Sequence, residues 1–291
     1  MFRAATDLVV LQVSVVDSEH RFVSDLGVGD FAVYEEGQRQ NVATFVSTTA
    51  PLDVAILLDT SASMGANLKI AQRAAIQLVD SLKADDRGTL IVFNDTVQVK
   101  QALTRDTDSL ESAIRGVTAR GTTALYDAIY IAQHELARAR QGTEPRRQAI
   151  VVLSDGDDTR SRLSFDDVID EARRSAITVF TITTALYPGT TPVGIDQQIR
   201  FDMRQLAEVT GGRTFAAVGI ADLERVYDEI AVELGQQYWL GYVRPNPAQD
   251  GFRRVSVVVE TRQGLRARTR SGYQVSTPRR VGAPARSGVT D

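Results

Sequence analysis

Hard oxygen donors follow two strand-like apolar runs of the sequence, at the point where each run ends. The run at residues 54–58 is followed by a carboxylate and two hydroxyls at alternate positions, namely Asp59, Ser61 and Ser63. A second apolar run, at residues 149–153, leads into Asp155. Carboxylate and hydroxyl oxygens suit Mg²⁺ and not a thiophilic metal. These runs therefore predict a divalent-cation site, provided that the fold brings their ends together.

Alternating strand and helix patterns between about residues 51 and 236 must position these donors. Strands are predicted at 54–58, 89–93, 97–103, 149–153, 177–183 and 213–217, and helices at 68–82, 110–117, 125–139, 165–175, 203–209 and 222–234, the last capped by Asp222. This alternation predicts a doubly wound, mostly parallel α/β sheet with helices on both faces. Ligands bind such a sheet at the carboxyl ends of its strands, so Asp59 and Asp155 are expected at one edge.

The segments on either side of this region carry strand patterns without a helical period. They are residues 8–15, 31–34 and 41–46 before it, and 238–243, 252–260 and 265–273 after it, with a hairpin predicted to turn at Gly37. We expect both segments to form one small antiparallel β subdomain; two separate β elements are the alternative. The predicted division is 1–50, 51–236 and 237–275, followed by a disordered tail at 276–291 that is rich in Pro, Gly, Ser and Arg.

Composition excludes several classes of protein. The chain has 291 residues, 43% hydrophobic and 24% charged, and no cysteine, which rules out disulfides, thiolate metal sites and cysteine nucleophiles. Its net charge of −4 argues against nucleic acid as the main partner. No apolar run approaches the about 20 residues that a membrane span needs, and the N-terminus lacks a signal-peptide pattern. The Arg-rich end, including Arg266, Arg268 and Arg270, is expected to be a solvated strand face and a tail.

The order of the polar motifs resembles a known site. Asp59-Thr60-Ser61-Ala62-Ser63, then Gly121-Thr122-Thr123 before a helix, then Ser154-Asp155-Gly156, resembles the metal ion-dependent adhesion site of von Willebrand factor A (VWA) domains. The resemblance implies Mg²⁺, with Mn²⁺ as the alternative, held directly or through water by Asp59, Ser61, Ser63, Thr123 and Asp155. Thr123 is preferred to Thr122 because the family's usual Leu stands two residues after it. A Glu or Asp of a protein partner would complete the coordination.

The flanking segments resemble a narrower group. Residues 30–37 before the central region, and 237–242 with 270–273 after it, are similar to the bacterial VWFA-related proteins named from acidobacteria. This resemblance covers nearly the whole chain. Because those proteins are mostly exported, it implies a periplasmic or extracellular location.

These observations favour a non-enzymatic module that binds an acidic residue of a protein partner through the metal. The alternative is a structural or assembly subunit that makes its contacts through the β subdomain, near Trp239 or the Arg266, Arg268 and Arg270 face, with the metal only bracing its loop. A metal-dependent hydrolase is the third hypothesis, although no base or nucleophile stands out. The motifs of serine hydrolases, phosphate-binding loops, dinucleotide loops and EF-hands are missing. Trp239 is expected to be buried between the β subdomain and the main sheet, and Asp157 and Asp158 to face solvent.

Overall fold

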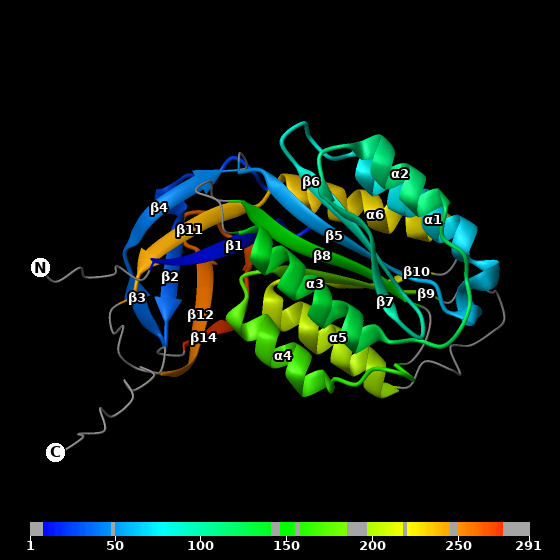
Figure 1. Cartoon of the computed structure of the whole chain (residues 1–291). Coiled ribbons are helices and arrows are strands. Elements are labelled where there is room, and N and C mark those ends of the chain that lie inside the picture. The colour runs from blue at the N-terminus through cyan, green and yellow to red at the C-terminus, as the bar shows by residue number, and fades with distance from the viewer. Residues whose placement is uncertain are drawn as a thin grey trace, which may run out of the picture.

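The computed structural model describes residues 8–47, 50–140, 146–154, 158–184, 197–217, 220–244 and 250–275. Within these ranges the chain forms two parts that lie side by side, a three-layered α/β part and a β sandwich (Figure 1).

A six-stranded sheet forms the middle layer of the α/β part. Its strand order is β10-β9-β8-β5-β6-β7, with β5 Leu52–Asp59, β6 Arg87–Phe93, β7 Val97–Thr104, β8 Arg147–Ser154, β9 Thr178–Thr184 and β10 Thr214–Ala217. All neighbouring strands are parallel except β7, which runs antiparallel to β6. Every residue of β5 and β8 is buried, as expected for central strands covered on both faces.

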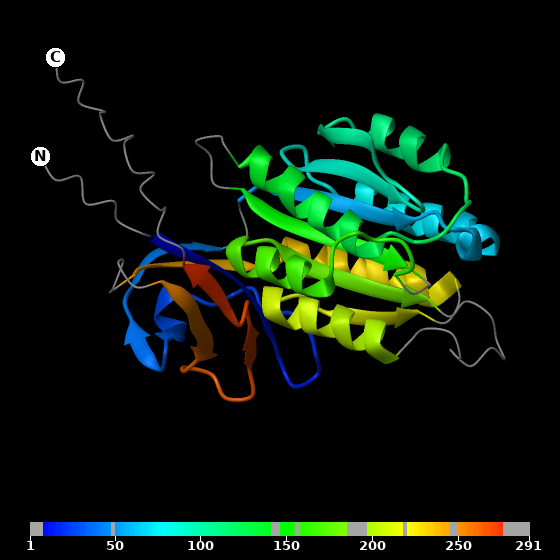
Figure 2. The ribbon, with the colours of Figure 1, turned by 60° about the horizontal axis from the view of Figure 1, so that its bottom comes forward.

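Helices cover both faces of this sheet. They are α1 Leu68–Asp80, α2 Thr107–Arg115, α3 Leu125–Ala139, α4 Phe165–Arg174, α5 Gln197–Thr210 and α6 Ile220–Gly235, with the short 3₁₀ helices η1 Val28–Asp30 and η2 Ala62–Ala66. Helices α1, α2 and α6 pack on one face, and α3, α4 and α5 on the other (Figures 1 and 2). The predicted doubly wound α/β fold is therefore confirmed. Asp222 lies in the first turn of α6 and does not cap it, because the helix begins at Ile220.

Strand order reverses between β5 and β8. The chain leaves β5 through α1 to β6 on one side, whereas β8 and β9 extend the sheet on the other side. The carboxyl ends of β5 and β8, at Asp59 and Ser154, therefore flank the point where doubly wound folds bind ligands.

The β sandwich consists of two four-stranded sheets. Their orders are β13-β1-β11-β4 and β14-β12-β2-β3, with β1 Leu8–Val16, β2 Phe31–Glu35, β3 Gln38–Gln40, β4 Val42–Ser47, β11 Tyr238–Val243, β12 Gly251–Val259, β13 Arg266–Arg268 and β14 Gly272–Val275. Alternate residues of both sheets fill a shared core. The N- and C-terminal segments thus build one antiparallel subdomain, as predicted.

Two details of the sandwich differ from the prediction. The chain turns at Gly37 as expected, but the second strand of that hairpin is only β3, and β4 joins the other sheet beside β11. The strand predicted at 265–273 is divided into β13 and β14, which pair with β1 and β12 in different sheets. A pattern of alternating residues shows that a segment is extended, but it does not identify the partner strand.

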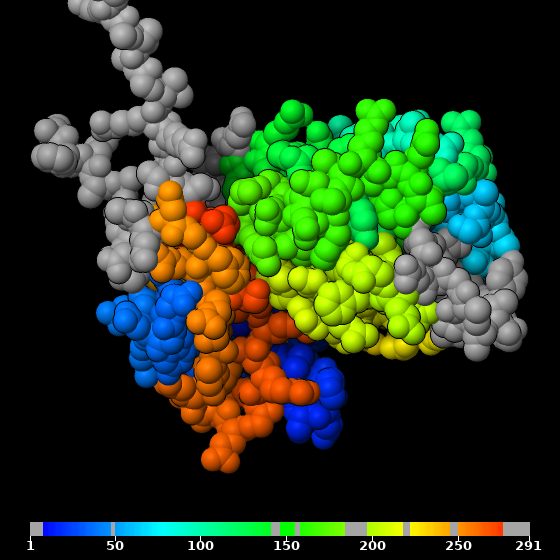
Figure 3. Space-filling view, turned by 90° about the horizontal axis from the view of Figure 1, so that it is seen from below, coloured from blue at the N-terminus to red at the C-terminus, as the bar shows by residue number. Residues whose placement is uncertain are grey.

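The sandwich packs against the α/β part (Figure 3), and charged side chains take part in the contact. Glu233 of α6 is fully buried and accepts hydrogen bonds from the Ser14 hydroxyl, at 2.9 Å, and from Arg268. The expectation of a solvated arginine face is therefore wrong for Arg268, and also for Arg270, which lines the junction. Within the part of the chain that the structure describes, no helix is long and apolar enough to cross a membrane.

Candidate metal centre

The loop that leaves β5 gathers the first predicted donors. Asp59 is 0% exposed, and its Oδ1 accepts a 2.8 Å hydrogen bond from the backbone N–H of Ser61. The hydroxyls of Ser61 and Ser63 lie 2.9 Å apart. Asp59 and Ser61 are buried, whereas Ser63 is exposed, so the cluster extends from the core to the surface. The alternate spacing in the sequence therefore places one carboxylate and two hydroxyls in one small cluster.

A second loop, before α3, is fastened to the first by backbone hydrogen bonds. The N–H of Ala62 donates to the carbonyl of Gly121 at 2.9 Å, and the N–H of Arg120 donates to the carbonyl of Thr60 at 2.7 Å. Thr123 is buried in this second loop, just before the first turn of α3. The structure thus brings the loop of Thr123 against the loop of Ser61.

Asp95, after β6, holds the second loop in shape. Its Oδ1 accepts hydrogen bonds from the backbone N–H of Thr122, at 2.6 Å, and from the Thr122 hydroxyl, at 2.5 Å. The hydroxyl, followed by the N–H, keeps the pKa of Asp95 below its usual value. Gly121 has φ +76°, and a Cβ there would lie 2.5 Å from Asp95 Oδ2. The glycine is therefore required both by the backbone conformation and by the nearby carboxylate.

Asp158 holds the Thr123 loop from the other side. Its carboxylate accepts hydrogen bonds from the N–H of Tyr126, at 2.8 Å, and of Ser161, at 2.9 Å. The carbonyl of Thr123 accepts from the N–H groups of Thr159 and Arg160. The expectation that Asp158 faces solvent is wrong, because these backbone donors partly bury it between two loops.

The end of β8 meets the Asp59 carboxylate. The hydroxyl of Ser154 donates a 2.6 Å hydrogen bond to Asp59 Oδ2, so the motif that begins with Ser154 starts in contact with the first loop. Asp155, the fifth predicted ligand, and Asp157 lie outside the described residues. The contact of Ser154 with Asp59 brings the two strand ends together, as their parallel arrangement predicts.

The donor set fits a hard cation. Among the residues that the structure describes, no three His, Cys, Asp or Glu side chains gather as a metal cluster, so a site here depends on hydroxyls as well as carboxylates. Asp59, Ser61, Ser63 and Thr123 offer only oxygen atoms, which is the chemistry that Mg²⁺ and Mn²⁺ share. Ser63 is exposed, so this side of the cluster lies at the molecular surface.

Sequence reasoning missed the two carboxylates that brace the loops. Asp95 comes two residues after the apolar strand β6, near the same edge of the sheet as Asp59 at the end of β5, and this position was the available signal. Asp158 lies near two other acidic residues, and nothing in that acidic run distinguishes the one that accepts backbone hydrogen bonds from Tyr126 and Ser161.

Comparison with known proteins agrees with this architecture. The family model of the von Willebrand factor type A domain matches residues 53–229. A UPF0353 protein of Mycolicibacterium paratuberculosis is 26% identical over 228 residues, covering 70% of this chain and 66% of the relative. Another, of Nocardia farcinica, is 26% identical over 215 residues, covering 63% of each chain. The chain therefore spans just under two thirds of the length of these relatives.

Solved structures share the fold at low sequence identity. The von Willebrand factor type A protein of Catenulispora acidiphila matches with a TM-score of 0.54 at 14% identity, over 91% of this chain and 73% of that one. Proximal thread matrix protein 1 of the mussel byssus, solved with a zinc-occupied MIDAS motif, matches with a TM-score of 0.53 at 17% identity, over 69% and 49%. The first match extends over the sandwich as well as the α/β part.

Proposed function

Because the chain belongs to the von Willebrand factor type A domain family, we propose that it is a non-enzymatic protein-binding module that grips an acidic side chain of its partner through a divalent cation. The proposed ligands are Asp59, Ser61, Ser63, Thr123 and Asp155, and the proposed cation is Mg²⁺, with Mn²⁺ as its substitute. The zinc-occupied motif of the mussel protein supports a cation at this type of site.

One observation carries the proposal. At the carboxyl edge of the sheet, beside the point where the strand order reverses, the Asp59 carboxylate accepts from the Ser61 N–H, and the hydroxyls of Ser61 and Ser63 lie 2.9 Å apart. A cation bound here would use all three oxygen atoms as ligands.

The chain's own residues prepare this cluster. The N–H of Ser61 and the hydroxyl of Ser154 fix the two oxygen atoms of Asp59, and Asp95 and Asp158 fix the loop of Thr123. Prepositioned ligands lose little conformational freedom on binding, which favours affinity. When bound, Mg²⁺ supplies an open coordination position that an external carboxylate can fill. The site lies on the α/β part, within the proposed domain of residues 51–236.

Metal titration tests the site directly. Calorimetric titration with Mg²⁺ should show saturable binding to the unmodified protein and none to Asp59→Asn. Asp108→Asn, which removes an exposed carboxylate in the first turn of α2, is the matched control and should bind as the unmodified protein does. Equal affinity in both variants would refute the assigned ligands.

Partner capture tests the function. A protein retained by the immobilised chain in Mg²⁺ should be released by EDTA, and it should fail to bind Asp59→Asn. A partner that stays bound in EDTA and also binds Asp59→Asn would refute recognition through the metal.

A specific feature of the sandwich supports the second candidate, an assembly subunit. Leu8 and Val243 pair across β1 and β11, and both are nearly half exposed, at 48% and 46%. Contiguous exposed apolar surface marks sites of contact with other proteins, so this pair is the place on the sandwich to test. This candidate requires partner retention in EDTA and its loss in Val243→Ser, the outcome opposite to that of the first candidate.

A further inference from the structure

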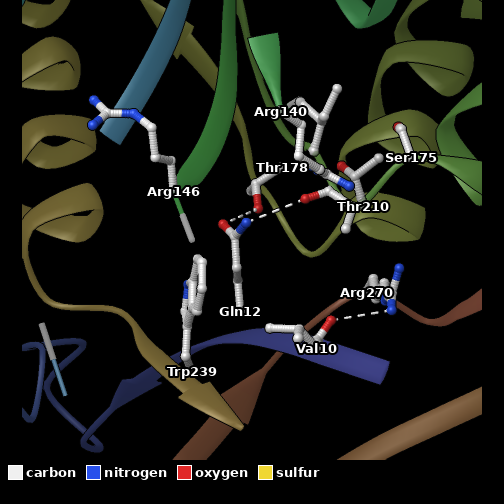
Figure 4. A pocket seen from close by; sticks show the side chains of 11 residues that line it. Val10, Gln12, Arg140, Arg146, Ser175, Thr178, Thr210, Trp239 and Arg270 are labelled. Atoms are coloured by element: carbon white, nitrogen blue, oxygen red, sulfur yellow. Dashed lines mark hydrogen bonds between the residues drawn. The ribbon is translucent and has the colours of Figure 1, made fainter. Parts of the chain in front are cut away.

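A cavity lies at the junction between the sandwich and the α/β part, at the end of the sheet opposite Asp59. Its volume is about 190 Å³. Its walls come from both parts of the molecule, with side chains of the sandwich below and of the α/β part above (Figure 4). The sandwich contributes Val10, Gln12, Trp239 and Arg270, and the α/β part contributes Arg140, Arg146, Ser175, Ala176, Ile177, Thr178 and Thr210.

Two of the three arginines in this wall are held by neutral groups. Arg140 donates from Nε and Nη2 to the amide oxygen of Gln148, at 3.1 and 2.7 Å. Arg270 donates from Nη2 to the carbonyl of Val10 at 3.1 Å, and its guanidinium lies over the ring of Tyr273. Arg146 differs, since it pairs with the buried carboxylate of Asp53. No Asp or Glu is among the described residues that line the cavity.

The positive charges of Arg140 and Arg270 are close enough to repel each other. Burial is the main cause that lowers the pKa of Arg270 to about 10, and the charge of Arg140 lowers it further. The Nε atom of Arg270 is buried and has no hydrogen-bond partner among the described residues. A buried donor without a partner costs free energy, and an anion in the cavity would remove that cost.

Trp239 adds a second buried donor without a partner. Its side chain is 9% exposed, and its Nε1–H makes no hydrogen bond within the described part of the chain. Val10, Ala176 and Ile177 add apolar surface to the lining of the same cavity. Buried indole N–H groups usually have a partner, so this donor is left for a polar group of a ligand or a water molecule.

We propose that this cavity binds a small organic acid, whose flat apolar body packs against Trp239 and whose carboxylate accepts hydrogen bonds from Arg140 and Arg270. Size supports this class, because an apolar cavity of about 150 Å³ is large enough for benzene. An acid with one ring therefore fits, whereas most drug-sized ligands need at least about 300 Å³. The ligand touches both parts of the molecule, so its binding strengthens their junction.

The single tryptophan makes the test specific. Since the chain has one Trp, its ¹H–¹⁵N spectrum contains one indole resonance, which reports on this cavity. Titration with benzoate should shift that resonance saturably. Benzamide, which has the same shape without the charge, should bind about tenfold more weakly, equivalent to about 1.4 kcal/mol. Inorganic phosphate, an anion without a ring, should compete only weakly.

Variants of one helix supply the control. Arg140→Gln removes a guanidinium at the end of α3 that lines the cavity, and should weaken benzoate binding about tenfold. Arg138→Gln removes the same charge two residues earlier, where the side chain is 77% exposed and pairs with Glu135, and should leave binding unchanged. An indole resonance indifferent to benzoate, equal binding of benzamide, or equal effects of the two variants would each overturn the proposal. None of these results depends on the metal site.

Discussion

The two edges of the central sheet hold charged groups of opposite sign. At the carboxyl edge, backbone N–H groups and hydroxyls donate to the carboxylates of Asp59, Asp95 and Asp158. At the amino edge, carbonyl and amide oxygens accept from the guanidinium groups of Arg140 and Arg270. Neutral partners fix a charged group without cancelling its charge. Charge retained in this way is what the proposed cation at the first edge and the proposed carboxylate ligand at the second require.

Asp53 is the exception that shows what full compensation looks like. It lies at the amino end of β5, six residues before Asp59 on the same strand, and both carboxylates are fully buried. Asp53, however, forms ion pairs with Arg87, at 2.7 Å, and with Arg146, at 2.7 Å. Two buried aspartates of one strand thus differ in their partners: two guanidinium groups compensate Asp53, whereas Asp59 accepts hydrogen bonds from the Ser61 N–H and the Ser154 hydroxyl.

The largest expected effect comes from comparing these two aspartates. In EDTA, Asp53→Asn should lower the free energy of unfolding by about 3 kcal/mol, because it leaves two guanidinium groups, one nearly buried, without a counter-charge. Asp59→Asn should cost only about 1 kcal/mol, since its partners include a neutral N–H and a hydroxyl. Urea unfolding of both variants measures the difference. Equal losses would contradict the division between a structural and a ligand-binding edge.

A smaller effect is expected at Glu233, which links the sandwich to α6. Glu233→Gln should cost about 2–3 kcal/mol, because Arg268 loses its buried counter-charge. Calorimetry should also show less cooperative unfolding, with the sandwich separating from the α/β part. Glu229→Gln on the same helix is the control, and should cost less than about 1 kcal/mol because its ion pairs are partly open to solvent. A Glu233→Gln variant as stable as this control would show that the junction depends on apolar contacts alone.

Most of the carboxyl edge was predictable from the sequence, and most of the amino edge was not. Asp59 and Ser154 end apolar runs, and parallel strands bring such ends together. Glu233 and Arg268 are 35 residues apart, on a helix and a strand of different parts, and no local periodicity relates them. Trp239 was expected to be buried at this junction and is, because β11 is covered on both faces: Tyr238 and Leu240 lie in the sandwich core, and Trp239 lies against the α/β part. The cavity at this junction forms only when the sandwich packs on the α/β part, and a local sequence pattern does not encode that packing.

Glycine substitutions sharpen the comparison at the carboxyl edge. Gly121→Ala and Gly37→Ala both place a side chain at positive φ, +76° and +78°, and each should cost about 1–2 kcal/mol. Only at Gly121 does the new Cβ approach Asp95, so only that variant should also weaken Mg²⁺ binding, by about tenfold. Calorimetric titration separates the two effects. Unchanged Mg²⁺ affinity in Gly121→Ala would show that the loop shape does not matter to the site.

The smallest expected effect is the pH dependence of Asp95. The Thr122 hydroxyl and N–H lower its pKa in the folded state, so its contribution to stability is fully present above the unfolded value of about 3.9 and is lost as pH falls through the lower folded value. The difference in stability between the unmodified protein and Asp95→Asn should therefore shrink below about pH 4. Thr122→Val, which removes the hydroxyl donor, should reproduce part of this dependence. Asp95 and Thr122 are both exposed, so a small effect is expected. A large effect would mean that protonation of Asp95 releases the whole Thr123 loop. The carboxyl edge of the sheet would then be less stable than the amino edge.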